Sequence, residues 1–114
     1  MTRVFIVNQP LTPYGEPFFD VSMAEEYGQV IHLLPPGWPP DDANEVYAAL
    51  ATGLCDFNES DFIVPVGDMS AIVMAVALAA GRVGAELRWL EWRKSQRRYV
   101  PRRMFNGRRI QNDR

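Results

Sequence analysis

The chain has 114 residues, one cysteine and a formal net charge of −2 at pH 7. Hydrophobic residues make up 47% of it and charged residues 23%, which fits one globular domain and excludes a disordered chain. A single cysteine, Cys55, excludes an internal disulfide, so the chain is not a small disulfide-held secreted scaffold and a reducing compartment is expected.

The first third of the chain predicts two strands around a short helix. The β-branched run over residues 3–8 predicts a buried first strand, and residues 29–34 predict a second. Between them, a short helix is expected over residues 23–27. Asp20 or Ser22 can cap its first turn, because both side chains accept hydrogen bonds from free helix amides.

A second helix is expected after the proline-rich turn at residues 35–40. Asp42 with Glu45 three residues later resembles a capping box, which marks a helix start. The helix is predicted to be amphipathic, with one side facing water. Its expected apolar face carries Val46, Tyr47, Leu50 and Leu54.

Residues 62–66 predict a third strand, although Pro65 lacks a backbone donor and indicates an edge, an end or a bulge. The next helix, Met69–Ala80, is apolar nearly all round, and Gly81 is its expected stop. Such a helix needs cover on two sides, from the C-terminal segment or from a second copy of the chain. Its apolar run is too short to cross a bilayer, so no membrane partner is expected.

The C-terminal part predicts a hairpin of two strands, over residues 86–93 and 98–104. Residues 1–104 are therefore expected to form a single α/β domain, and residues 105–114 a basic tail. Alternation of strands and helices predicts a small Rossmann-like or flavodoxin-like three-layer domain. Right-handed crossovers would place the first strand centrally, the second on one side and the others on the other side. The alternative is an α+β domain whose first two strands form an antiparallel ribbon.

Ligands of such sheets bind beyond the carboxyl ends of the strands. Asp68 opens a helix there, so it either caps that helix or holds a metal, a ribose hydroxyl or a cationic group. The candidate ligand rim consists of Asn8, Gln9, Gly37, Trp38, Gly67 and Asp68.

The sequence offers no catalytic set and no zinc-ligand spacing, so no metal site is assigned and no cofactor is expected. Its many Asp and Glu residues leave a magnesium site held by carboxylates as an open alternative. Neither of the two best-defined glycine-rich phosphate-binding motifs occurs. His32, the only histidine, lies in a predicted strand and is interpreted as a packed structural residue. Cys55 has no basic neighbour and is interpreted as a small buried hydrophobe. We therefore lean against an enzyme.

Charge is strongly polarised along the chain. Residues 1–92 carry three arginines against thirteen acidic residues, whereas residues 93–114 carry nine basic residues against one acidic residue. Guanidinium groups pair with phosphates and aromatic faces stack on bases, so this mixture indicates nucleic-acid or partner binding. The alternative is that the tryptophans pack on the core while the arginines are solvated or clamp the acidic body. The candidate binding residues are Arg93, Lys94, Arg97, Arg98, Tyr99, Arg102, Arg103, Arg108 and Arg109.

Five short motifs follow one another between about Arg3 and Pro101: VFIVNQP, AEEYG, LLPPG, FIVPVGD, and RWLEWR followed by RRYVP. In this order the chain resembles small proteins encoded by tailed phages and environmental viruses. The resemblance implies a phage origin, a location in the host cytoplasm and an accessory role. It implies no catalytic residues.

Three functional hypotheses follow. The first is a phage accessory protein that binds nucleic acid through the basic C-terminal segment, or binds a host protein. The second is a module that binds a small ligand or nucleotide at the predicted rim. The third is a structural homo-oligomer built on the Met69–Ala80 helix.

Overall fold

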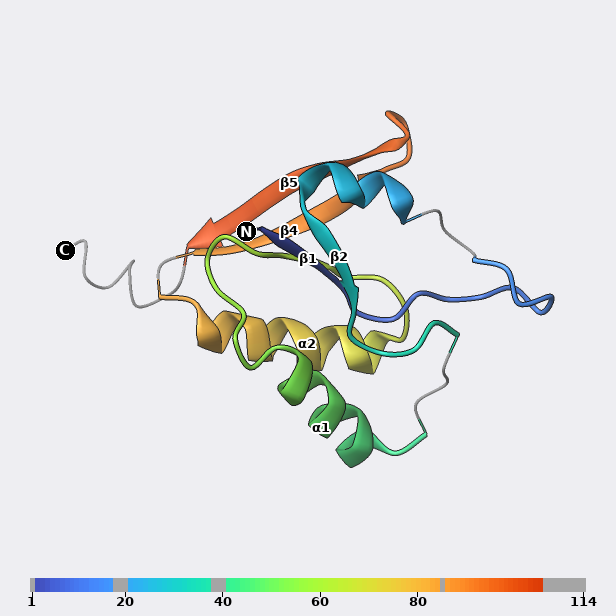
Figure 1. The fold of residues 1–114 in the computed structure, drawn as a ribbon, viewed down its shortest axis with the longest axis horizontal. Helices are drawn as coiled ribbons and strands as arrows, with labels where there is room; N and C mark the ends of the chain where they lie inside the picture. The colour runs from blue at the N-terminus through green and yellow to red at the C-terminus, as the bar shows by residue number, and fades with distance from the viewer. Residues whose placement is uncertain (1, 18–20, 38–40, 85, 106–114) are drawn as a thin grey trace.

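The computed structural model describes residues 2–17, 21–37, 41–84 and 86–105, and folds them around one five-stranded sheet (Figure 1). The strand order is β2-β1-β3-β4-β5; the first four strands are parallel and β5 is antiparallel to β4. This confirms the predicted α/β domain, with its mostly parallel sheet, C-terminal hairpin and central first strand. The strands are β1 (Arg3–Ile6), β2 (Gln29–His32), β3 (Phe62–Val64), β4 (Glu86–Arg93) and β5 (Arg98–Phe105).

The alternative fold, an antiparallel ribbon of the first two strands, is wrong. β1 pairs with β2 in parallel, with Arg3 opposite Gln29 and Ile6 opposite His32. A parallel pair needs a crossover connection over one face of the sheet, and residues 7–28 supply it.

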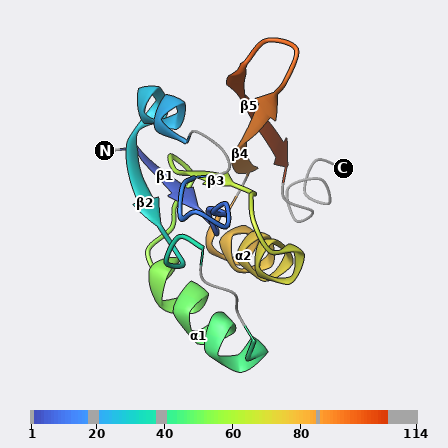
Figure 2. The same cartoon turned by 90° about the vertical axis from the view of Figure 1, so that its right-hand side faces the viewer.

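Both long helices cover the same face of the sheet. They are α1 (Ala43–Gly53) and α2 (Met69–Arg82), whereas the 3-10 helix η1 (Ser22–Tyr27) lies on the opposite face (Figure 2). The handedness of the crossovers explains this arrangement. The connection from β1 to β2 moves one way along the sheet, and the next two connections move the other way, so right-handed crossovers place them on opposite faces.

The predicted start of α1 is confirmed, whereas two other predictions about the long helices are wrong. Asp42 accepts hydrogen bonds from the amides of Asn44 and Glu45, as predicted for the start of α1. Tyr47 is 52% exposed, so its placement on the apolar face was wrong. The predicted stop of α2 at Gly81 was also wrong, because the helix continues to Arg82.

The connection between β1 and β2 forms a 3-10 helix, and Ser22 is its first residue rather than its cap. Val21 occupies the cap position without a side-chain hydrogen bond, so the Ser22 cap was wrong; Asp20 lies outside the described residues. At the other end, the Tyr27 hydroxyl donates to the Tyr99 carbonyl over 2.9 Å and ties η1 to β5. Burial raises the pKa of Tyr27, and a hydrogen bond with Glu26 adds to the effect.

The β4–β5 hairpin extends beyond the part of the sheet that α2 covers. β3 stops at Val64, directly before Pro65, so the proline ends a central strand as one of the sequence alternatives foresaw. β4 pairs with β3 at Ile63 and Trp89, but it pairs with β5 along its whole length, from Glu86 to Arg93. The hairpin therefore stands away from the helices (Figure 2).

No helix among the described residues combines the length and apolar character needed to cross a bilayer.

Candidate functional site

The described rim residues do come together at the carboxyl edge of the sheet, where they bond to one another. The amide of Gly37 donates to the Gln9 carbonyl over 2.8 Å, and the amide of Asp68 donates to Oδ1 of Asn8 over 3.3 Å. Asn8 and Gln9 are each only 6% exposed. Trp38 lies outside the described residues.

Asp68 caps α2, as the first of its two interpretations predicted. Its carboxylate accepts a hydrogen bond from the Ala71 amide over 3.0 Å. Gly67, just before it, has φ +107°, and a Cβ there would lie 2.0 Å from the Asn8 carbonyl oxygen. Glycine is therefore required at 67 for the chain to pass so close to β1.

One hydrogen-bond donor of this rim has no acceptor among the described residues. Nδ2 of Asn8 is buried and has no hydrogen-bond partner among the described residues. The orientation of the amide is fixed, because its oxygen accepts the Asp68 amide. A buried donor without an acceptor costs about 1–3 kcal/mol, so this group favours an additional acceptor at the rim.

A polar cavity of about 200 Å³ opens close by, between the first turns of α1 and α2. The residues that line it are Asp41, Ala43, Val46, Asp68, Ser70 and Met74. The lining includes two carboxylates, those of Asp41 and Asp68, and the Ser70 hydroxyl, so the cavity suits a small polar molecule with hydrogen-bond donors.

Two interpretations of single residues were wrong. His32 is exposed rather than packed, because it ends β2, the edge strand of the sheet. Cys55 is exposed rather than buried, in the turn after α1.

Six of the eight candidate cations lie in the β4–β5 hairpin. Because side chains alternate along a strand, these cations are distributed over both faces of the hairpin. Arg88 and Arg103 are direct partners across the hairpin, and so are Trp89 and Arg102. Successive side chains of a strand alternate between faces. Arg88 and Arg103 therefore share the face of η1, whereas Arg98 and Arg102 lie on the face of the long helices.

The two aromatic residues at the hairpin tip differ in exposure. Tyr99 is 2% exposed, so its ring belongs to the core and not to the binding surface that the sequence predicted. Trp92 is 37% exposed and packs edge-on against it, with ring centroids 5.0 Å apart. Arg108 and Arg109 lie outside the described residues.

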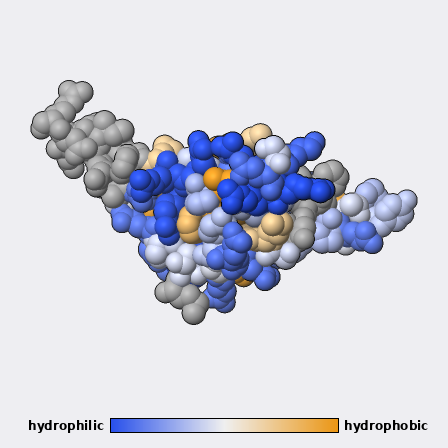
Figure 3. Space-filling view, turned by 90° about the horizontal axis from the view of Figure 1, so that it is seen from above, coloured by the Kyte–Doolittle hydropathy of each residue, from blue (hydrophilic) through white to orange (hydrophobic). Residues whose placement is uncertain are grey.

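Most of the hairpin cations are not neutralised within the described part of the chain. Arg93 pairs with Glu91, and Arg103 approaches Glu86 at 3.9 Å while its side chain stays 69% exposed. Arg98 donates to the neutral Gln96 side chain over 2.8 Å. Seen from the side of η1 and the hairpin, the molecule is covered mostly by hydrophilic side chains (Figure 3).

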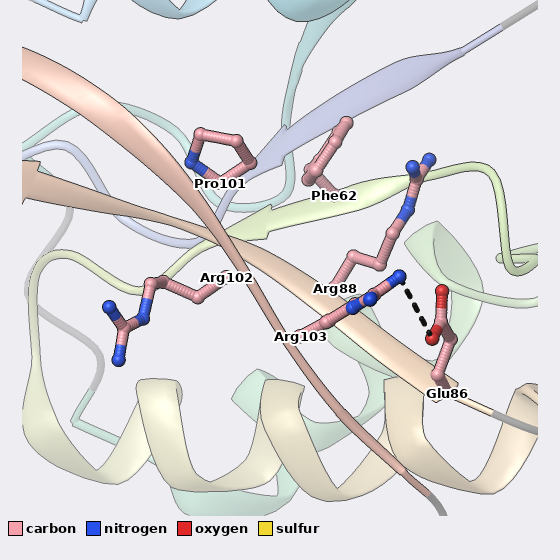
Figure 4. Close-up of a pocket in the computed structure, with 6 residues that line it drawn as sticks. All are labelled: Phe62, Glu86, Arg88, Pro101, Arg102 and Arg103. Carbon is pink, nitrogen blue, oxygen red and sulfur yellow. Dashed lines mark ion pairs between the residues drawn. The ribbon is translucent and has the colours of Figure 1, made fainter.

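A cavity of about 300 Å³ lies on the η1 face, beside the β3, β4 and β5 strands (Figure 4). Arg88 and Arg103 lie side by side in it with Glu86, whereas Arg102 extends away from them. The Arg88 guanidinium lies 4.1 Å from the centroid of the Phe62 ring and donates to the Ser60 carbonyl. We call this the arginine pocket; its lining residues are Phe62, Glu86, Arg88, Pro101, Arg102 and Arg103.

Of the six residues that line this pocket, two, Arg102 and Arg103, were among the predicted binding residues. A turn between Arg93 and Arg98 sets the register that places Arg88 opposite Arg103, so counting along the two strands could have found that pair. Phe62 comes from another strand, and its place beside Arg88 follows only from the order of strands in the sheet.

The fold and its surface define a class: a small α/β domain with a projecting, arginine-rich β-hairpin. Comparison with known families makes this specific. The chain belongs to the phage Pam3 gp32-like protein family, whose match covers residues 2–105, nearly all of the chain. The resemblance to uncharacterised phage proteins is thereby confirmed. No curated protein matches the chain. No solved structure matches it either.

Proposed function

We propose that this phage protein is an accessory protein that acts in the host cytoplasm by binding nucleic acid through the β4–β5 hairpin. The proposal rests mainly on one observation: the cations of the hairpin are largely unpaired. Among the described residues, two of its seven cations, Arg93 and Arg103, meet a carboxylate, and Arg103 does so at 3.9 Å with an exposed side chain.

The electrostatics of such a surface favour phosphate contacts. Exposed guanidinium groups that their own protein does not neutralise can pair with phosphate oxygens and release the counterions of the nucleic acid. The exposed edge of Trp92 adds an aromatic group at the tip, where an unpaired base could stack. The acidic body repels the same polymer, so contact is confined to the hairpin and the basic residues that follow it.

The test is fluorescence anisotropy of the intact chain with a labelled 20-nucleotide single strand and with the matching duplex, over a range of salt. The hairpin variant Lys94→Gln with Arg98→Gln should weaken binding about tenfold, and lower the salt slope by about 0.7 for each lost single-strand phosphate contact.

A matched control adds the same change of net charge far from the hairpin. Ala48→Glu with Thr52→Glu places two carboxylates on exposed positions of α1. This control should change binding much less than the hairpin variant. If the intact chain binds neither strand nor duplex at low salt, the nucleic-acid proposal is wrong, and a host protein becomes the partner to test.

A second candidate function is binding of a small ligand or nucleotide at the carboxyl edge. It is favoured by the unpartnered Nδ2 of Asn8 and by the polar cavity near the helix starts. The strand order β2-β1-β3-β4-β5 supports it as well, because in a reduced Rossmann-like or flavodoxin-like domain the ligand crevice lies at this edge.

Thermal-shift measurements against nucleotides and other small phosphate esters test this second candidate. A ligand present at 100 times its dissociation constant adds about 2.7 kcal/mol of stability, which raises the melting temperature by several degrees. The Asn8→Asp variant, which loses the amide donors, should lose that shift. Unchanged melting with every compound would contradict this candidate and leave the hairpin proposal intact.

A further inference from the structure

We propose that the arginine pocket seats a phosphate group of the nucleic-acid backbone between Arg88 and Arg103, and that Glu86 competes with it. This inference rests on the proposed function and adds the site, the chemical group recognised and an internal competitor.

The charge balance of the pocket favours an anion. Two guanidinium groups, those of Arg88 and Arg103, line the pocket with one carboxylate, that of Glu86; Arg103 points toward Glu86, whereas Arg88 extends toward Phe62 (Figure 4). The single ion pair described among them, Arg103 to Glu86, has its closest atoms 3.9 Å apart, which is too long for a hydrogen bond. Arg103 therefore keeps donors for another acceptor, and the pocket keeps one positive charge in excess.

Arg88 is held in place before any ligand arrives. Its guanidinium stacks 4.1 Å from the centroid of Phe62, a ring that is only 7% exposed, and it donates to the Ser60 carbonyl. The Nε of Arg88 is buried and has no acceptor among the described residues. A fixed, incompletely satisfied guanidinium loses little conformational entropy on binding, and its planar fork matches the oxygens of a phosphate.

The size and position of the pocket fit a group on a polymer. The pocket has a volume of about 300 Å³ and lies on the η1 face of the sheet, beside the edge strand β5. Arg102, on the rim, extends away from the other two arginines toward the opposite face. A strand that places one phosphate in the pocket can thus continue across the hairpin toward Arg102 and the tip.

The arrangement predicts opposite effects from two substitutions in one pocket. Arg103→Gln removes a phosphate donor from an exposed side chain and should weaken binding of the 20-nucleotide strand about tenfold, or about 1.4 kcal/mol. Glu86→Gln removes the competing carboxylate and should strengthen binding several-fold. Matched controls with the same charge changes are Arg82→Gln, at the exposed end of α2, and Glu45→Gln, in the exposed first turn of α1.

A chemical probe checks that the group recognised is a charged phosphate. The same strand with neutral methylphosphonate linkages should lose the difference between the intact chain and Arg103→Gln, because neither protein then has a charged group to bind. Inorganic phosphate should compete with the unmodified strand more effectively than chloride does at equal ionic strength.

The outcomes separate the two proposals. If the intact chain binds no nucleic acid, the proposed function fails and the pocket proposal fails with it. If the intact chain binds while Arg103→Gln and Glu86→Gln behave like their controls, the function stands and the phosphate site lies elsewhere on the hairpin. Circular dichroism and melting of each variant show whether a loss of binding is a loss of folding.

Discussion

Asp61 is a fully buried carboxylate whose charge is balanced by Arg3. Its side chain is fully buried and accepts hydrogen bonds from the Arg3 amide at 3.1 Å, from the Arg3 side chain at 2.8 Å and from the Asn58 amide at 3.0 Å. These contacts tie the start of β1 to the turn before β3. The hydrogen bonds that the Arg3 guanidinium donates to Asp61 are the main reason that the pKa of Arg3 is raised, so Arg3 remains charged throughout the working pH range.

We expect Asp61→Ala to lower the free energy of unfolding by about 3–5 kcal/mol, because it removes the buried carboxylate of the Arg3 ion pair and leaves the amides of Arg3 and Asn58 without their acceptor. Urea denaturation followed by tryptophan fluorescence measures the change. Asp56→Ala is the matched control, since Asp56 pairs with the same Arg3 but is 67% exposed, and its loss should cost less than about 1 kcal/mol. Equal losses in the two variants would contradict the assigned role of burial.

At the residue scale, sequence alone misjudged side chains whose burial depends on neighbours far along the chain. His32 stands among apolar residues, which suggested a strand buried on both faces, but β2 is an edge strand and ends there. Cys55 follows the helix α1 in a turn, where no other element covers it.

At the scale of elements, the starts of the two long helices were predictable, whereas the end of α2 was missed by one residue. Asp42 and Asp68 cap their helices through bonds that reach only two or three residues, so the signal is contained in the local sequence. Gly81 stays helical and α2 continues to Arg82, while the next residue, Val83, is extended and buried in the core. The burial of Val83 depends on tertiary packing, which the local sequence does not contain.

Within the described part of the chain, nothing covers Met69 and Val73 on the outer side of α2, where the sequence predicted a second cover. Ala71, Ala75 and Ala79 pack inward, whereas Met69 is 71% and Val73 60% exposed. We propose, as a third hypothesis, that a second copy of the chain covers this side.

Light scattering at several hundred micromolar should then give the mass of a dimer, and Val73→Glu should restore the monomer by placing a charge in the contact. Thr52→Glu, an equal charge change on the exposed side of α1, should leave the dimer unchanged. A monomeric mass for the intact chain at that concentration would exclude this hypothesis.

At the scale of the whole molecule, the sheet was predictable because few topologies satisfy the handedness of the crossovers. Three strand–helix–strand units and one hairpin leave little freedom once the first strand is central. The arginine pocket was harder to predict from the sequence. In the chain, α2 lies between Phe62 and Arg88, and the two residues come into contact only because their strands are neighbours in the sheet.

The separation of acidic and basic residues along the chain is also a separation in the folded molecule. The hairpin and its cations stand away from α1, whose first turn carries Asp42 and Glu45 (Figure 2). One alternative was that the C-terminal arginines clamp the acidic body. The two described hairpin arginines that meet a carboxylate, Arg93 and Arg103, instead meet Glu91 and Glu86 of the hairpin itself.

The outer border of β5 has one more consequence. The Tyr99 carbonyl faces away from β4 toward Tyr27, which occupies it, and Pro101, with the same orientation two residues later, has no amide hydrogen. Another strand would thus find the Tyr99 acceptor already occupied and no donor at Pro101. Both features disfavour edge-to-edge pairing of the cationic hairpin with another chain at these two positions.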